Sequence, residues 1–234
     1  MPGKKLKTAV YIMNVGELSD EKLFSLAYNS VFDERKRKTD KYRFEKDKRL
    51  SLGGGLLLKY ALSEAGYNVC SPEFAYGENE KPYLKDSDIY FSISHSEDYA
   101  ICAVSDAEIG CDIEKIKDVD LKIAEKFFTP SEYESILKEP DENGRQDIFF
   151  RCWTLKESFM KATGLGMSLS LSDFEIVPQK NISVIQSVDS RKYYFTEYTQ
   201  ISGYKCSLCV VDKDISPDFI AVGVKELLFG GDKE

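Results

Sequence analysis

The chain has 234 residues, of which 42% are hydrophobic, so it can bury a sizeable core in one large or two small domains. Its formal net charge of -8 at pH 7 argues against a nucleic-acid-binding surface. No apolar run reaches the roughly 18 residues of a membrane-spanning helix, and the first residues lack the apolar segment of a signal peptide. We therefore expect a cytoplasmic protein with neither a membrane nor a nucleic acid as partner.

The 6 cysteines stand mostly within apolar stretches, which is typical of reduced, buried thiols rather than of a disulfide framework. Cys206 and Cys209 form the one C-x-x-C pair, in a segment that reads as a strand, where residues three apart point to opposite faces. The chain also has a single histidine. We therefore expect two core thiols here rather than a redox or zinc site.

In the first half of the chain, a strand is predicted over residues 7–15 and helical structure over about 17–40. A basic cluster over residues 35–49 follows in this otherwise acidic chain and indicates a local anion-facing surface, with a solvated helix face as the alternative. A long helix is predicted over 45–65, ending near Gly66. Three glycines at 53–55 inside this helix indicate a close helix contact or a local break.

Residues 89–114 alternate between apolar and polar and predict strands joined by short turns at 96–98 and 105–107. A helical stretch over about 121–137 contains a capping box that runs from Thr129 to Glu132, with proline at its first helical position. A polar loop is expected over 138–145, then the strongest helix over 147–163, and strand character over about 174–224. The predicted class is α+β.

Two carboxylates alternate along the strand that ends this region. Asp112 and Glu114 would point to the same face, because strand side chains alternate with a period of two. Packed near an apolar core they would repel each other unless a cation or a shared proton lay between them. Mg²⁺ fits, because proteins hold it with a few carboxylates while substrate phosphates complete its shell. The alternative is an exposed strand face with two ordinary acids.

A second constellation lies on the strongest helix, where Trp153, Glu157 and Lys161 share one face at i, i+4 and i+8. The ordinary interpretation is a surface Glu–Lys pair beside a tryptophan. The functional one assigns Glu157 to a metal ion or to proton removal and Lys161 to a phosphate oxygen.

Four segments together carry a resemblance: FSISHS, GCDIE, FFTPSEY and WTLKESFMKATGLGMSL. In order and spacing they resemble the 4′-phosphopantetheinyl transferases of the surfactin-synthetase-activating type, over most of the chain. The combination G-x-D-x-E followed by W-x-x-K-E-[SA]-x-x-K is highly specific. The resemblance implies a monomer of two similar α/β subdomains related by a pseudo-twofold axis, an N-terminal one over 1–108 and a C-terminal one over 109–234.

The resemblance also implies the reaction: transfer of the phosphopantetheine arm of coenzyme A to a serine of an apo acyl or peptidyl carrier protein. Adenosine 3′,5′-bisphosphate is released, and the reaction requires Mg²⁺. Glu157, directly or through a water, would be the general base.

By the same resemblance, Asp112, Glu114 and Glu157 would bind the metal, and Glu157 and Lys161 would be catalytic. The residues implied to contact coenzyme A are Arg35, Arg37, Arg49, Lys81, Ser94, His95, Lys156 and Lys161. The adenosine and 3′-phosphate contacts would lie in the first subdomain, and the metal and catalytic motifs in the second. One departure is Glu80, where the family has glycine before the lysine of its G-K-P segment.

Helix 121–137, with Phe127 and Phe128, is expected to form part of the carrier-docking surface. Three alternatives stay open: a catalytically silent coenzyme A-binding protein of the same fold, the short trimeric carrier-protein synthase type, and a magnesium-dependent phosphohydrolase. The second is disfavoured by length, because its chains are about half as long, and the third by the resemblance.

Overall fold

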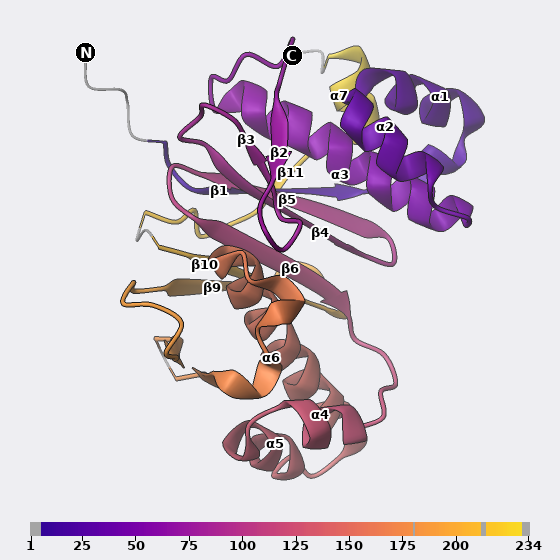
Figure 1. Ribbon diagram of the computed structural model, residues 1–234. Coiled ribbons are helices and arrows are strands. Elements are labelled where there is room, and N and C mark those ends of the chain that lie inside the picture. Colours follow the sequence, from indigo (N-terminus) through magenta and orange to yellow (C-terminus); the bar gives the residue numbers. More distant parts are fainter. Residues whose placement is uncertain (1–5, 180, 212–213, 231–234) are drawn as a thin grey trace.

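The structure is a computed structural model that describes residues 6–179, 181–211 and 214–230 (Figure 1). Its first part contains β1 (Ala9–Asn14), α1 (Glu21–Ser30), α2 (Asp33–Asp40), α3 (Glu45–Glu64), β2 (Phe74–Tyr76), β3 (Pro82–Leu84), β4 (Tyr90–Ser96) and β5 (Tyr99–Ser105). The rest contains β6 (Ile109–Lys115), α4 (Lys122–Phe127), α5 (Pro130–Leu137), α6 (Glu142–Thr163), β7 (Glu175–Val177), β8 (Ser183–Ile185), β9 (Tyr194–Tyr198), β10 (Tyr204–Val210), β11 (Ile220–Ala221) and α7 (Val224–Phe229). Short 3₁₀ helices span Gly16–Ser19, Gly166–Ser168 and Leu171–Asp173.

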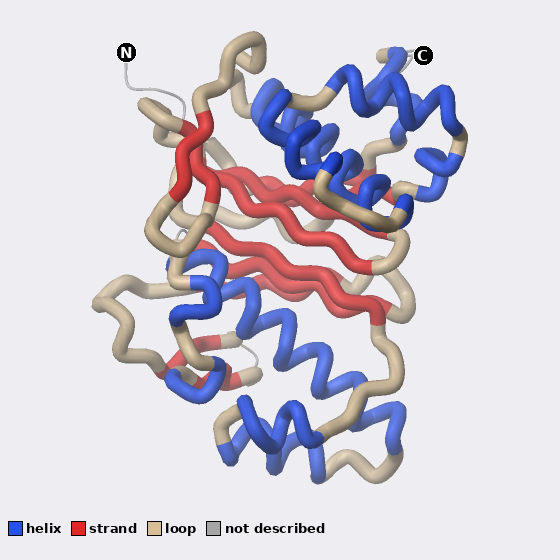
Figure 2. The backbone as a smooth tube through the Cα atoms, turned by 45° about the vertical axis from the view of Figure 1, so that its right-hand side comes forward, coloured by secondary structure: helices blue, strands red, loops and turns tan. Residues whose placement is uncertain are grey.

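Two small sheets form the centre of the molecule. The first has the order β11-β1-β5-β4 and the second β6-β10-β9. One face of β1 and β5 packs under α3, while their other face packs against β6 and β10. Helix α6 covers the outer face of the second sheet, so the layers run helix, sheet, sheet, helix (Figures 1 and 2). The predicted α+β class, with one α/β unit in each half, is confirmed.

The three glycines of α3 mark a close contact, and the helix runs through them unbroken. A Cβ atom at Gly53 would overlap Val15, and one at Gly54 would lie 2.9 Å from Ile93. One at Gly55 would lie 2.5 Å from Arg35. The missing side chains thus allow α3 to lie directly on the first sheet and on α2.

Two boundaries differ from the sequence prediction. The helical region predicted over 17–40 is divided, because residues 31 and 32 adopt extended backbone where Val31 packs into the core. The loop predicted over 138–145 is wrong in its second half, because α6 begins at Glu142. Asp141 caps this helix through its side chain, which accepts a hydrogen bond from the amide of Gly144 at 2.8 Å. The capping box of Thr129 and Glu132 is confirmed.

The end of the described chain returns to the first sheet. β11 pairs in parallel with β1, and Val222 and Val224 are buried in the core under α3. These residues belong to the predicted second subdomain, and the boundary between 108 and 109 stays a prediction. The two predicted subdomains include residues 1–5 and 231–234, which lie outside the described residues. Among the described residues, none of the helices combines the length and apolar character needed to cross a membrane.

Candidate active site

A row of serines joins the two sheets where β4 faces β6. Ser92, Ser94 and Ser96 are each at most 8% exposed. The hydroxyl of Ser92 bonds to the amide of Cys111, that of Ser94 to Asp112, and that of Ser96 to both Glu114 and the amide of Lys115. These hydrogen bonds are 2.7 to 3.1 Å long. We call this row the serine seam. It places Asp112 and Glu114 side by side along one edge, which confirms that they share a face of β6.

Gly110 explains how α6 reaches the same edge. A Cβ atom at this position would overlap the backbone carbonyl oxygen of Ser158 and the backbone nitrogen of Ala162. The backbones of β6 and α6 therefore touch, and the turn of helix around the contact carries Glu157 and Lys161. The glycine of the G-x-D-x-E motif is required by this close approach rather than by an unusual backbone angle.

Lys161 and Asp112 form the centre of the candidate site. The Nζ atom of Lys161 donates to Asp112 Oδ1 at 2.7 Å, to Ser94 Oγ at 3.1 Å and to the Cys111 carbonyl at 3.2 Å. Burial is the largest influence on the pKa of Lys161 and acts to lower it, but the charges of Asp112, Cys111 and Glu157 and the hydrogen bond to Asp112 together raise it. Asp112 is 3% exposed, and its Oδ2 atom has no hydrogen-bond partner among the described residues.

The two glutamates complete a concentration of negative charge. Burial and then the charge of Asp112 raise the pKa of both Glu114 and Glu157 above the ordinary value for glutamate. For Glu114 the hydrogen bond from Ser96 acts in the opposite direction. Three carboxylates are thus coupled, and Lys161 is the cation that bonds directly to one of them.

Within the described ranges, no three His, Cys, Asp or Glu side chains are already arranged to hold a metal ion. The donor set nevertheless fits a hard divalent cation, because it consists of carboxylate oxygens and one of them, Asp112 Oδ2, is buried and unpaired. The other oxygen of Asp112 is occupied by Lys161. Asp112 Oδ2 is therefore the oxygen of this carboxylate that a cation could bind while Lys161 stays on Oδ1.

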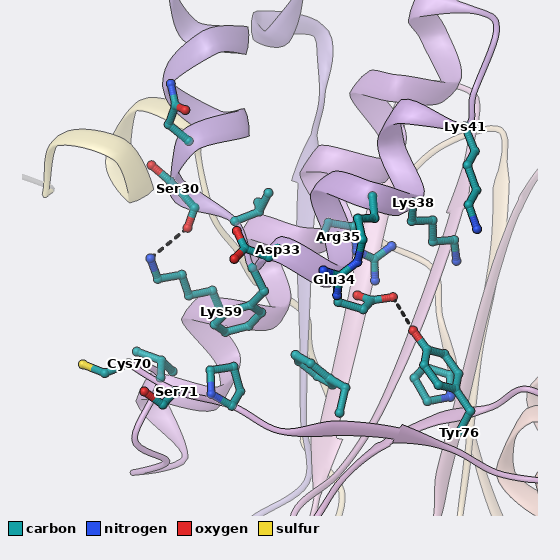
Figure 3. A pocket seen from close by; sticks show the side chains of 18 of the residues that line it. Ser30, Asp33, Glu34, Arg35, Lys38, Lys41, Lys59, Cys70, Ser71 and Tyr76 are labelled. Carbon is teal, nitrogen blue, oxygen red and sulfur yellow. Dashed lines mark hydrogen bonds between the residues drawn. The ribbon is translucent and has the colours of Figure 1, made fainter.

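A cavity of about 1210 Å³ on the first part of the chain has a basic wall (Figure 3), and the charge of Lys161 acts on Lys38 in that wall. Its basic lining residues are Arg35, Arg37, Lys38, Lys41 and Lys59. Arg35 is 5% exposed and its Nε atom has no partner in the described part of the chain.

Burial and then the charges of Lys161 and Lys38 lower the pKa of His95. Tyr76 donates to Glu34 across the cavity at 2.7 Å (Figure 3).

Two predicted contact residues lie at the margins. Arg49 is half-buried on α3 and does not line this cavity. Lys81 donates to the carbonyl of Ile109 at 2.9 Å, and burial lowers its pKa to about 8. Glu80, which stands where the family has glycine, lines the cavity and has a positive φ of 60°.

Lys156 does not fit its predicted contact with coenzyme A, and we correct that assignment. Its side chain is 0% exposed. Its Nζ atom bonds to the Leu171 carbonyl at 2.8 Å, the Phe174 carbonyl at 2.7 Å and Glu132 at 2.8 Å. All three ammonium hydrogens are thus used inside the protein, so Lys156 cannot meet a ligand in solution.

Two aromatic residues are likewise structural. Trp153 stacks on Phe149 with ring centroids 5.8 Å apart, in the core between α4, α5 and α6. Phe128 is 5% exposed in that same core, so it cannot form a docking surface, whereas Phe127 is 41% exposed.

Two residues near the site were missed by the sequence analysis. Ser96 bonds to Glu114, and Lys38 lines the cavity. The alternation of three serines on the predicted strand could have identified Ser96, since it gives that strand a hydroxyl-bearing face. Lys38 was one of many lysines in the basic cluster, and nothing in the sequence distinguished it.

Comparisons with known proteins agree with this geometry. The family model described as "4'-phosphopantetheinyl transferase superfamily" matches residues 108–209, and that of "4'-phosphopantetheinyl transferase, N-terminal" matches residues 19–107. The chain is 36% identical to 4'-phosphopantetheinyl transferase gsp of Aneurinibacillus migulanus, over 81% of this chain and 80% of that protein. It is 34% identical to 4'-phosphopantetheinyl transferase Sfp of Bacillus subtilis (strain 168), over 85% of this chain and 90% of that protein.

A third relative is 4'-phosphopantetheinyl transferase HetI of Nostoc sp., with 37% identity over 67% of this chain and 68% of that protein. Similarity at this level, along most of both chains and through both family models, shows the relationship without relying on any one motif. The chain therefore belongs to the 4′-phosphopantetheinyl transferases of the Sfp type, as its motifs predict.

Proposed function

We propose that this enzyme transfers the phosphopantetheine arm of coenzyme A to a serine of an apo acyl or peptidyl carrier protein, in a reaction that depends on Mg²⁺. The observation that carries the proposal is the coupled group of Asp112, Glu114, Glu157 and Lys161, together with a cavity whose basic wall includes Lys38, on which the charge of Lys161 acts. The protein is proposed to act as a cytoplasmic monomer, with neither a membrane nor a nucleic acid as partner. Its net charge of -8 supports the last point.

The basic cavity suits the adenosine and 3′-phosphate end of coenzyme A. Arg35, Arg37 and Lys38 line it, and the unpaired Nε of the buried Arg35 is a donor available to a phosphate oxygen. Ser94, which bonds to Asp112 and Lys161, and His95, on which the charges of Lys161 and Lys38 act, would meet the bound molecule on its way towards its diphosphate. Arg49 and Lys81 keep their proposed place on the adenosine side.

Asp112, Glu114 and Glu157 would hold Mg²⁺, which supplies charge neutralisation at the diphosphate. Lys161 would move from Asp112 to a phosphate oxygen, since the diphosphate offers it a comparable anionic partner. Glu157 would accept the proton of the carrier serine, directly or through a water, while the serine oxygen bonds to the β-phosphorus. The bond from that phosphorus to the oxygen of the leaving adenosine 3′,5′-bisphosphate breaks in the same displacement.

The carrier is proposed to dock on α4 rather than at Phe128. Ile123 and Phe127 are 36% and 41% exposed there, with Lys122 and Lys126 on the same helix. This pairing of apolar and basic side chains suits a small acidic partner. Phe127→Ala should raise the KM for the carrier with little change in the KM for coenzyme A. An unaltered carrier KM would exclude this surface.

The deciding experiment is to incubate the protein with coenzyme A, a panel of apo carrier proteins and Mg²⁺, with EDTA as control, and to weigh the carriers intact. We expect a gain equal to one phosphopantetheine arm, only with metal present. Glu157→Gln should abolish the gain while coenzyme A still binds. Binding of coenzyme A without modification of any carrier would instead favour the catalytically silent protein.

A further inference from the structure

The serine seam contains three hydroxyls with three different tasks. Ser92 accepts a hydrogen bond from the amide of Cys111 at 3.0 Å and touches no carboxylate. Ser94 donates to Asp112 and also contacts Lys161. Ser96 donates to Glu114 Oε2 at 2.8 Å, and its own oxygen accepts from the amide of Lys115 at 3.1 Å. Ser96 is thus linked to one metal-site carboxylate without a contact to the catalytic lysine.

We propose that Ser96 is a positioning residue, which holds Glu114 turned towards Asp112 so that the two carboxylates can bind a divalent cation together. This inference rests on the proposed function, because it assigns the cation to the same carboxylates. It assigns a role to the last residue of the FSISHS segment, which the predicted site does not include.

Glu114 needs a restraint of this kind. Its side chain has several rotatable bonds, it is half-buried, and the negative charge of Asp112 beside it favours conformations that point away. A hydroxyl donor on Oε2 opposes that repulsion and leaves Oε1 available to a cation. Hydrogen bonds to a charged group are strong enough to matter here, and partners of ligating carboxylates commonly orient them.

The hydroxyl of Ser96 is itself fixed in direction. Because the Lys115 amide donates to its oxygen, the hydroxyl hydrogen is left to point at Glu114. The turn that follows is anchored from both sheets. The backbone carbonyl of Asp98 accepts a hydrogen bond from the amide of Val15 at 2.9 Å. Its carboxylate accepts a second one from the hydroxyl of Tyr204 at 3.3 Å. Ser96 therefore stands at a rigid end of the seam rather than on a free loop.

The test compares Ser96→Ala with Ser92→Ala, which removes a hydroxyl from the same seam without touching a carboxylate. Binding of Mn²⁺ as a spectroscopic probe is measured by electron paramagnetic resonance, with coenzyme A present, alongside the Mg²⁺ dependence of transfer. Ser96→Ala should weaken metal binding by about tenfold. Its turnover at saturating metal should stay near that of the wild type. Ser96→Thr, which keeps a hydroxyl, should restore metal affinity.

Ser92→Ala should leave metal affinity unchanged even if it lowers the melting temperature. Unchanged metal affinity in Ser96→Ala, or an equal loss in both alanine variants, would overturn the role of Ser96. Failure of the proposed function looks different, because the wild type itself would then neither bind Mn²⁺ with coenzyme A nor modify a carrier.

Discussion

Lys156 and Glu157 are neighbours in the chain but have opposite environments. Glu157 faces the coupled carboxylates at the edge of β6, while Lys156 points to the other side of α6 into the core. There Glu132 forms an ion pair with Lys156 and also accepts hydrogen bonds from the backbone amides of Thr129 and Ile176. One carboxylate thus ties the start of α5, the strand β7 and the helix that carries Glu157 to one another.

Lys156→Met should therefore act on stability rather than on coenzyme A. Breaking a buried ion pair by removing one partner leaves Glu132 charged and incompletely compensated, which costs about 3 to 5 kcal/mol. Urea unfolding should show this loss, while the KM for coenzyme A at a permissive temperature should stay near the wild-type value. Lys161→Met is the matched comparison on the same helix and should raise that KM. A raised KM in Lys156→Met with normal stability would restore the original assignment.

Lys81 makes stability depend on pH. Burial lowers its pKa in the folded protein to about 8, from an ordinary value of 10.5. Between these values the unfolded chain holds the proton and the folded chain does not, so the contribution of Lys81 to stability rises with pH. Below pH 8 the cost of burying the ammonium group is fully present.

Lys81→Met removes this ionisation, and the pH dependence should show in a comparison with the wild type. Urea unfolding of both proteins at pH 7.5 and 9.5, under reducing conditions, measures the difference. The wild type should gain stability relative to Lys81→Met at the higher pH. A constant difference at both pH values would mean that the Lys81 amine titrates normally.

At the scale of elements, the contact between β6 and α6 decides whether the site exists. Gly110→Ala would place a methyl group into the backbone of α6, where neither Ser158 nor Ala162 can yield without moving the helix. We expect a loss of stability of about 1 to 3 kcal/mol or more. Transfer activity should fall further than stability alone explains, because Glu157 and Lys161 would shift away from Asp112.

Gly53→Ala provides the control for this prediction. It also introduces a methyl group at a close helix contact, but the group that must yield is the side chain of Val15, on the far side of the first sheet from α6. It should lower the melting temperature without changing the Mg²⁺ dependence of the remaining activity. If both variants lose activity only in proportion to stability, the contact at Gly110 has no special role in the site.

The elements also show what the sequence could and could not predict. Strand alternation correctly placed Asp112 and Glu114 on one face, and the capping box marked the start of α5, because both signals are local. Helix periodicity could not show that Trp153 has a different environment from Glu157 and Lys161, because all three lie on one face of α6. That face packs into an aromatic core at Trp153 and meets the carboxylates at Glu157 and Lys161. The role of Lys156 depends on Glu132, Leu171 and Phe174, which no local pattern relates to it.

For the whole molecule, the final described segment is the feature with the widest consequences. β11 and α7 follow the second sheet in the chain, yet they extend the first sheet and fill the core under α3. Val224 is 0% exposed, so Val224→Ala should cost about 2 kcal/mol from the buried methyl groups it removes. Lys225→Ala on the same helix removes an exposed ion pair with Glu17 and should change unfolding little.

Because β11 and α7 return to the first sheet, the N-terminal half of the chain should depend on the C-terminal half for its stability. A fragment of residues 1–108 lacks β11 and α7, so β1 would have an unpaired edge and the core under α3 would be open to water. Its inner sheet face, which packs on β6 and β10, would also be exposed. We expect this fragment to be insoluble or unfolded alone, and to yield soluble protein when it is co-expressed with residues 109–234. A folded, soluble fragment 1–108, shown by dispersed amide signals in its NMR spectrum, would mean that α3 and three strands suffice, and that the return of the chain only reinforces a unit that is already stable.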